Sequence, residues 1–176
     1  MKSYLTKKIS NIKIVLTDVD GVLTDGGMYY SKRGDIMKKF FTRDGMGVTL
    51  LRNNEIPTII VTKEKNEIIK QWAKKMKVEK LFDGVIKKEM ILQKVCDKFK
   101  VTPKNIAYIG DDVNDLELLK RVGLSVVPRD GIKEAKKICD YCCENKGGQG
   151  AFREFADLIL LNKKTKIKIK EIERRN

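Results

Sequence analysis

Short apolar runs of strand length alternate along this chain with longer segments of helical periodicity. The strand-like runs are IKIVLT (12–17), IPTIIVT (56–62), IAYIG (106–110) and LSVV (124–127), with a weaker LFDGVI at 81–86. They are nearly continuous in hydrophobicity rather than alternating, which is typical of strands covered on both faces. The pattern therefore predicts an α/β fold in which helices cover both faces of a mainly parallel sheet.

Helical segments lie between these runs. In 65–77 the apolar residues recur at helical spacing, which favours a core position for Trp72 over a ligand-binding one. The other predicted helices span 45–54, 88–100, 113–121, 132–138 and 150–161. Together with the strands they predict a Rossmann-like, three-layer α/β/α architecture.

Two segments fall outside this alternation. GGMYYSKRGDIMKKFF (26–41) has apolar or aromatic residues on both sides of SKRGD, which predicts a β-hairpin that projects over the first strand's end. NKKTKIKIKEIERRN (162–176) predicts a basic C-terminal tail. Within it, KTKIKIK (164–170) is compatible with an edge strand, a partner contact or a frayed terminus.

Length and composition limit the class of protein. A chain of 176 residues fits one domain with one site, no apolar run approaches a membrane span, and the N-terminal residues lack a secretory signal's apolar segment. We therefore expect a cytoplasmic protein that does not enter a membrane. The formal charge of +14 allows nucleic acid as a partner, and it equally suits a small, multiply anionic substrate.

The side chains available for catalysis are restricted, because the chain contains no histidine. This excludes Ser-His-Asp and Cys-His catalysis and metal sites built on imidazole. The four cysteines include a C-x-x-C spacing in CDYCC but too few further ligands for zinc, so reduced thiols are favoured. Catalysis must therefore use carboxylates, lysines, hydroxyls, thiols or a hard metal ion.

Two acidic clusters follow predicted strands at the edge where parallel sheets bind ligands. Asp18 and Asp20 follow 12–17 and, two residues apart in an extended chain, face one side. Asp111 and Asp115 in IGDDVND follow 106–110. An Asx turn and helix capping are the structural alternatives. Two such clusters would repel each other without a cation, and an oxygen-only ligand set suits Mg²⁺.

Two further signals point to phosphate. Thr62 ends the strand 56–62, where a hydroxyl before a helix can hold a phosphate oxygen or serve as an N-cap. Lys88, beside Lys87, begins a predicted helix, and a lysine is unfavourable at this positive end of the helix dipole. A phosphoryl group and the carboxylates would compensate its charge; the alternative is that the lysine is exposed to solvent. The sequence thus offers a carboxylate nucleophile, a second acid for proton transfer, a metal site and phosphate ligands, which together predict phosphoryl transfer. No Walker sequence is present, which argues against ATP binding by that motif.

The order DVDGVLT, Thr62, Lys88, GDDVND resembles the four motifs of haloacid dehalogenase superfamily phosphotransferases, over about residues 12–161. We accordingly expect a phosphatase domain at 1–161. The resemblance implies that Asp18 is the nucleophile and Asp20 the general acid and base. It further implies that Thr62 and Lys88 bind the phosphoryl group. Mg²⁺ would be held by Asp18, Asp111 and the backbone carbonyl of Asp20, with Asp115 in the outer shell.

The spacing of the motifs and the sequence around them indicate which subgroup of the superfamily this chain resembles. The intervals 21–61 and 63–87 leave no room for a cap domain. TDVDGVLTDGGMYY, RDGMG, AYIGDDVNDLELLKRVGLSVVP and GGQGAFREF are similar to capless phosphatases of 3-deoxy-D-manno-octulosonate 8-phosphate and of nonulosonate (sialic-acid-type) 9-phosphates. That resemblance implies a place in lipopolysaccharide or sialic acid biosynthesis. It also implies a homotetramer whose hairpins pack together and whose neighbouring subunits complete each site.

The predicted specificity residues are Lys63, Glu64 and Arg153. The 8-phosphate enzymes usually read T-G-R where this chain reads Thr62-Lys63-Glu64, and the 9-phosphate subgroup has Thr-Gly-Glu-Lys. VPRDGIKEA also lacks the Asp-Ala-His segment common in 8-phosphate enzymes. These departures favour a 9-phosphate or broadened specificity. The alternatives are a low-activity homologue that serves as an oligomerising or partner module of a sugar-acid activation pathway and, third, a nucleic-acid-binding protein.

Overall fold

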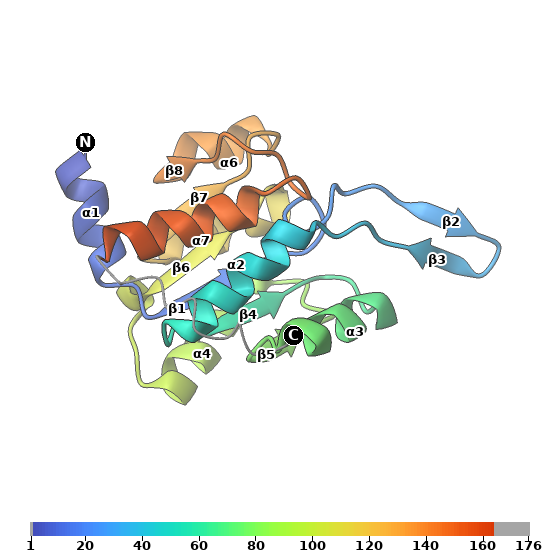
Figure 1. The fold of residues 1–176 in the computed structure, drawn as a ribbon, viewed down its shortest axis with the longest axis horizontal. Coiled ribbons are helices and arrows are strands. Elements are labelled where there is room, and N and C mark those ends of the chain that lie inside the picture. Colours follow the sequence, from blue (N-terminus) through green and yellow to red (C-terminus); the bar gives the residue numbers. More distant parts are fainter. Residues whose placement is uncertain (1, 164–176) are drawn as a thin grey trace, which may run out of the picture.

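A six-stranded sheet runs through the centre of the protein, whose computed structural model describes residues 2–163 (Figure 1). Its order is β5-β4-β1-β6-β7-β8, and every neighbouring pair is parallel. The strands are β1 Ile14–Thr17, β4 Thr58–Val61, β5 Lys80–Phe82, β6 Ile106–Ile109, β7 Leu124–Val127 and β8 Tyr141–Cys142. β4 and β5 lie on one side of β1, and the later strands β6, β7 and β8 lie on its other side. The strand order therefore reverses at β1, and parallel sheets commonly bind ligands at such a point.

Helices cover both faces of the sheet and complete three layers. One face carries α1 Lys2–Ser10, α2 Thr42–Asn53, α3 Glu67–Met76 and α7 Ala151–Asn162. The other carries α4 Ile91–Phe99, α5 Leu116–Arg121 and α6 Lys133–Ile138. Short 3-10 turns lie at Lys88–Met90, Pro103–Asn105 and Val113–Asp115. The predicted three-layer α/β/α fold with a parallel sheet is confirmed.

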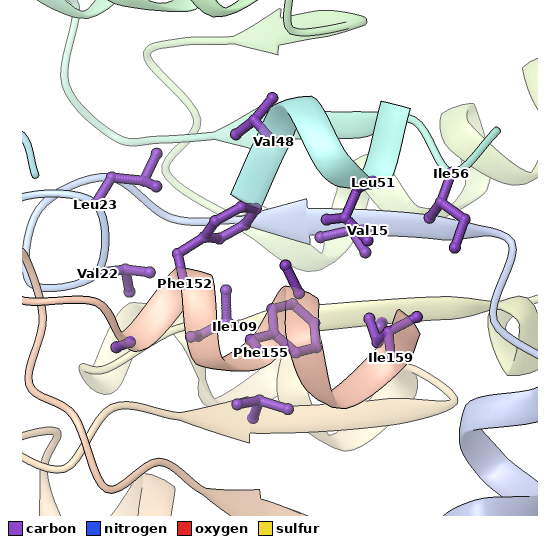
Figure 2. Close-up of a cluster of buried hydrophobic side chains, with 14 of the residues drawn as sticks. Val15, Val22, Leu23, Val48, Leu51, Ile56, Ile109, Phe152, Phe155 and Ile159 are labelled. Carbon is purple, nitrogen blue, oxygen red and sulfur yellow. The ribbon is translucent and has the colours of Figure 1, made fainter. Parts of the chain in front are cut away.

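The core is divided by the sheet into two clusters, because successive strand residues point to opposite faces. Val15 packs under α2 and α7, whereas Ile14 and Leu16 pack under the helices of the other face. Figure 2 shows Phe152 and Phe155 of α7 reaching into the first cluster beside Val15. Continuous apolar strands are thus explained by burial on both sides.

A two-stranded antiparallel hairpin, β2 Tyr29–Ser31 and β3 Gly34–Met37, projects away from the sheet (Figure 1). This confirms the predicted hairpin. Its base is closed by a bridge between Thr24 and Phe40, and the Phe40 ring stacks on Trp72 of α3 with centroids 4.7 Å apart. Trp72 therefore has the packing role that its spacing predicts.

Several element boundaries differ from the prediction. α2 begins at Thr42 rather than 45, because Asp44 is fully buried and accepts a hydrogen bond from the backbone N–H of Arg153, which holds the first turn against α7. The predicted helix 88–100 begins as a 3-10 turn. α1 and β8 were not predicted.

Most of the predicted tail 162–176, including 164–170, lies outside the described residues. Within residues 2–163, no helix combines the length and apolar character that crossing a bilayer requires.

The packing of α7 gives a stability prediction. Phe155 is fully buried, so Phe155→Ala should lower the free energy of unfolding by about 3–5 kcal/mol, the usual effect of removing a core aromatic side chain. Leu161→Ala on the same helix removes a side chain that is 67% exposed and should change it by less than about 0.5 kcal/mol. Urea denaturation at fixed Mg²⁺ measures both, and equal losses would contradict the assigned burial.

Candidate active site

The polar residues that follow β1, β4 and β6 converge on one pocket at the carboxyl edge of the sheet. Asp18 follows β1, and its backbone N–H donates to the carbonyl of Ile109 in β6 at 3.0 Å. The pocket has a volume of about 270 Å³ and is lined by Asp18, Asp20, Thr62, Lys63, Glu64, Asp111, Asp112, Val113 and Asn114. The structure thus brings together most of the predicted site residues.

A buried lysine links two of the carboxylates. Lys88 is fully buried, and its Nζ lies 2.8 Å from Asp18 Oδ1 and 2.7 Å from Asp115 Oδ1. Burial would lower the pKa of Lys88, but the charges of Asp18 and Asp115 outweigh it and raise the pKa above its usual value. A buried ammonium needs such partners. The alternative of a solvent-exposed Lys88 is therefore wrong, and carboxylates compensate its charge.

Asp115 is fully occupied by donors from the protein. Its Oδ1 accepts hydrogen bonds from Lys88 and the Tyr108 hydroxyl, and its Oδ2 accepts from the backbone N–H groups of Asp111 and Asp112, at 2.8 Å and 3.1 Å. Four donors satisfy both carboxylate oxygens. Asp115 is therefore placed to orient the site rather than to bind a metal directly.

Asp18 and Asp111 are the carboxylates with room for a metal ion. Oxygens of Asp18, Asp111 and Asp115 lie within 4.8 Å of one another, and Asp111 Oδ1 is buried without a partner among residues 2–163. Lys88 pairs with Asp18 and Asp115 but not with Asp111, so the group keeps an excess of negative charge that a divalent cation would neutralise. An oxygen-only donor set fits Mg²⁺.

The pKa values of these two carboxyls are raised, first by burial and then by the neighbouring carboxylates. Burial, reinforced by the charge of Asp115, raises the pKa of Asp18 to about 7 despite the opposing effect of Lys88. Burial and the charges of Asp18 and Asp115 raise the pKa of Asp111 to about 8. The metal-free site thus favours protons where a cation would otherwise bind.

Gly21 allows the two acidic clusters to approach. Its φ is +85°, and a Cβ at this position would lie 2.0 Å from Asp111 Oδ2. A side chain there would collide with the carboxylate and strain the turn. The glycine of the D-x-D-G sequence is therefore required by close packing as well as by the turn.

Asp20 lies in the same pocket but outside the group of three carboxylates. Its Oδ1 accepts hydrogen bonds from Lys38 Nζ at 2.8 Å and from the Thr24 hydroxyl at 3.1 Å. Lys38 comes from the hairpin end and its side chain is only 4% exposed. Lys38 is not among the predicted site residues; the available signal was a lysine pair on the arm returning from the hairpin.

Thr62 is buried at the pocket wall, and its hydroxyl accepts a hydrogen bond from the backbone N–H of Glu64 at 3.2 Å. The N-cap of α3 is Asn66, whose side chain accepts from the backbone N–H of Ile68 at 2.8 Å. The capping alternative for Thr62 is thus wrong. Its hydroxyl proton is available to the pocket.

Arg153 is not brought to this pocket. Its Nε donates to both carboxylate oxygens of Asp157, at 2.9 Å each, and it lines a separate pocket of about 580 Å³ with Phe41 and Tyr141. The cause is its place on α7, whose N-terminal turn lies over α2. In the single chain, Arg153 therefore has no contact with the acidic pocket.

The chain matches a hydrolase family and phosphatases of known name. Residues 50–154 match the haloacid dehalogenase-like hydrolase family. The chain is 35% identical over 156 residues to the 3-deoxy-D-manno-octulosonate 8-phosphate phosphatase of Haemophilus influenzae, covering 89% of this chain and 87% of the relative. The 9-phosphate preference stays a prediction.

Solved structures of such phosphatases share the fold. The Moraxella catarrhalis 3-deoxy-D-manno-octulosonate 8-phosphate phosphatase, in complex with magnesium, phosphate and KDO, superposes with a TM-score of 0.90 at 29% identity, covering 93% of this chain and 94% of that one. The cobalt-bound Haemophilus influenzae enzyme superposes with a TM-score of 0.87 at 35% identity, covering 89% and 92%.

The raised pKa values predict how Mg²⁺ binding depends on pH. The folded-state pKa values of Asp18 and Asp111, about 7 and about 8, exceed the ordinary 3.8, so the metal-free protein holds more protons than the unfolded chain between these limits. The stability from these groups is present at low pH and lost as pH rises through 7 and 8. Because Mg²⁺ competes with the protons, the rise in Tm that it causes should grow up to about pH 8.

Thermal unfolding with excess Mg²⁺ and with chelator, across this pH range, measures the rise in Tm that Mg²⁺ causes. Asp111→Asn should reduce the Mg²⁺-induced rise, whereas Asp157→Asn, in the separate pocket beside Arg153, should leave it unchanged. A rise in Tm that is independent of pH would contradict the assignment.

Proposed function

Since the chain belongs to the haloacid dehalogenase-like hydrolases and is a phosphoric monoester hydrolase, we propose that it hydrolyses the phosphate ester of 3-deoxy-D-manno-octulosonate 8-phosphate. The observation that carries the chemistry is the Asp18–Lys88–Asp115 arrangement beside Thr62 at the end of β1. The named activity of relatives at 35% identity supports the substrate.

Asp18 is the proposed nucleophile. Its carboxylate lies in the pocket, and Lys88 holds its Oδ1. Attack on phosphorus forms a bond to Asp18 and breaks the bond to the sugar oxygen, giving an aspartyl phosphate. Water then attacks the same phosphorus, which releases phosphate and restores the carboxylate.

Asp20 is the proposed general acid and base. It lines the same pocket two residues after the nucleophile. It gives a proton to the departing sugar alkoxide and then takes one from the attacking water. The two acids of the D-x-D sequence thus divide covalent chemistry from proton transfer.

Thr62 and Lys88 are the proposed phosphate ligands. Lys88 Nζ carries three protons and uses two on Asp18 and Asp115. Because Lys88 is fully buried behind Asp18, its third proton would reach a phosphoryl oxygen only when the phosphate lies against Asp18. The Thr62 hydroxyl is free to donate a second bond. Asp18, Asp111 and the backbone carbonyl of Asp20 would hold Mg²⁺, whose positive charge would reduce repulsion between the carboxylates and the phosphate.

A nonulosonate 9-phosphate is the second candidate substrate. The observation that favours it is Glu64 in the pocket wall, next to Lys63, where the sugar end of a substrate would lie. By the resemblance, the 9-phosphate subgroup has Glu at this position of its motif, whereas the 8-phosphate enzymes have Arg. The two candidates share the reaction and differ only in the sugar.

Activity assays test this proposal. Wild-type enzyme with Mg²⁺ should release phosphate from the 8-phosphate with a higher kcat/KM than from the 9-phosphate. Asp18→Asn should abolish turnover, and Asp20→Asn should lower it by about 10²–10⁴-fold, the usual contribution of general acid–base catalysis. Chelation should also stop release.

Turnover that survives both Asp18→Asn and chelation would contradict the mechanism. A reversed kcat/KM ratio would assign the 9-phosphate. Background rates on both would favour the partner-module alternative.

We also propose a cytoplasmic homotetramer assembled through the hairpin. Met28, Tyr30 and Ile36 are 68%, 63% and 62% exposed in the single chain, an unusual concentration of apolar surface on one small element. A second copy presenting the same surface would cover it.

Substitution in the hairpin tests the assembly. Met28→Glu combined with Ile36→Glu should convert the tetramer to monomers in light scattering coupled to size exclusion, because like charges would meet where apolar side chains pack. Met90→Glu is the matched control, since Met90 is 64% exposed on the 3-10 turn before α4, away from the hairpin. A wild-type monomer, or a double variant that stays tetrameric, would contradict the proposal.

A further inference from the structure

Lys38, at the base of the hairpin, contacts Asp20, which lines the candidate catalytic pocket. Its side chain is 4% exposed, and Nζ donates to Asp20 Oδ1 at 2.8 Å. The Thr24 hydroxyl donates to the same oxygen at 3.1 Å. Both bonds therefore hold Oδ1, and Oδ2 is the oxygen left to exchange a proton.

Lys38 also contacts a second carboxylate, that of Asp35 in the hairpin. Asp35 Oδ2 lies 3.6 Å from Lys38 Nζ and accepts a hydrogen bond from Asn66 Nδ2 at 3.3 Å. Asn66 is the N-cap of α3, and α3 follows the Thr62 loop of the pocket. The lysine is thus fixed between Asp20 and an anchor that joins the hairpin to the body of the protein.

This arrangement addresses a problem that Asp20 faces. Its side chain is 30% exposed, and the terminal torsion of an aspartate is broad, so without fixed partners either oxygen could face the substrate. A charge-assisted hydrogen bond to one oxygen removes that freedom. Proton transfer depends strongly on such placement, because an error of about 1 Å can cost about 10²-fold in rate.

We propose that Lys38 is a positioning residue for Asp20, which holds Oδ1 so that Oδ2 faces the oxygen of the departing alcohol. The inference rests on the proposed role of Asp20 as general acid. It gives the hairpin a part in the reaction in addition to assembly, since the residue that orients the acid and the carboxylate that anchors it both belong to the hairpin segment.

A pair of simple substrates separates this role from general damage. Loss of p-nitrophenolate needs little protonation, whereas loss of phenolate from phenyl phosphate depends more on a general acid. kcat/KM reports the steps up to departure of the leaving group, so it excludes the later attack of water. Lys38→Met should lower kcat/KM for phenyl phosphate by about 10-fold or more, and for p-nitrophenyl phosphate by less than about 3-fold.

Three variants control the experiment. Lys39→Met, which removes a neighbouring lysine whose side chain is 58% exposed and pairs with Asp25 at 3.4 Å, should leave both values unchanged. Lys38→Arg keeps a cationic donor and should recover part of the phenyl phosphate activity. Asp20→Asn should show the same leaving-group dependence more strongly, and thermal unfolding verifies that each variant is folded.

The outcomes distinguish this inference from the proposed function. Suppose that Asp20→Asn shows the leaving-group dependence, but that Lys38→Met lowers kcat/KM equally for both substrates or for neither. Lys38 then has no positioning role, and the inference is overturned. If Asp20→Asn itself lacks the dependence, the proposed role of Asp20 fails first. Neither result depends on which sugar phosphate the enzyme prefers.

Discussion

The placement of Lys88 between Asp18 and Asp115 is the interaction on which the site depends. The lysine is fully buried, and a buried ammonium is tolerable only with partners as close as 2.8 Å and 2.7 Å. These contacts join three separate segments: the end of β1, the turn before α5 and the 3-10 turn before α4. Replacing Lys88 by a neutral residue would leave two buried carboxylates facing each other, so site geometry and local stability are coupled.

Charge neutralisation continues outward from this lysine. Asp115 has no lone pair to spare, because the Tyr108 hydroxyl and two backbone N–H groups complete its hydrogen bonds. The remaining negative charge rests on Asp18 and Asp111, whose pKa values are raised by burial and by the neighbouring carboxylates, and Asp111 Oδ1 has no hydrogen-bond partner among residues 2–163. A divalent cation with oxygen ligands therefore completes the arrangement, and a formal charge of +14 on the chain favours the approach of an anionic substrate.

The sequence predicted the fold class and most of the site because both depend on local patterns. Continuous apolar runs mark strands buried on two faces, and residues directly after them lie at one edge whatever the details of packing. Features that depend on distant contacts were missed. β8 has two residues, and Ile9 is the one fully buried side chain among residues 4–10 of α1. The contact between Lys38 and Asp20 requires the hairpin to fold back. Arg153 was grouped with the site by motif alone, and its pairing with Asp157 could not be read from spacing.

Asp18 and Asp20, the two acids proposed for catalysis, are supported in different ways, and this difference has a consequence. Asp18 is fixed by the sheet and by buried Lys88, which are parts of the core. Asp20 is fixed by Lys38, whose own anchor Asp35 lies on a hairpin that extends from the body of the protein (Figure 1). This hairpin exposes apolar side chains. A second copy that covered that hairpin would therefore act on the arm proposed to orient proton transfer, without touching the proposed nucleophile Asp18. In a site without a cap domain, this would let contact between subunits influence the reaction while phosphate binding stays a property of each chain.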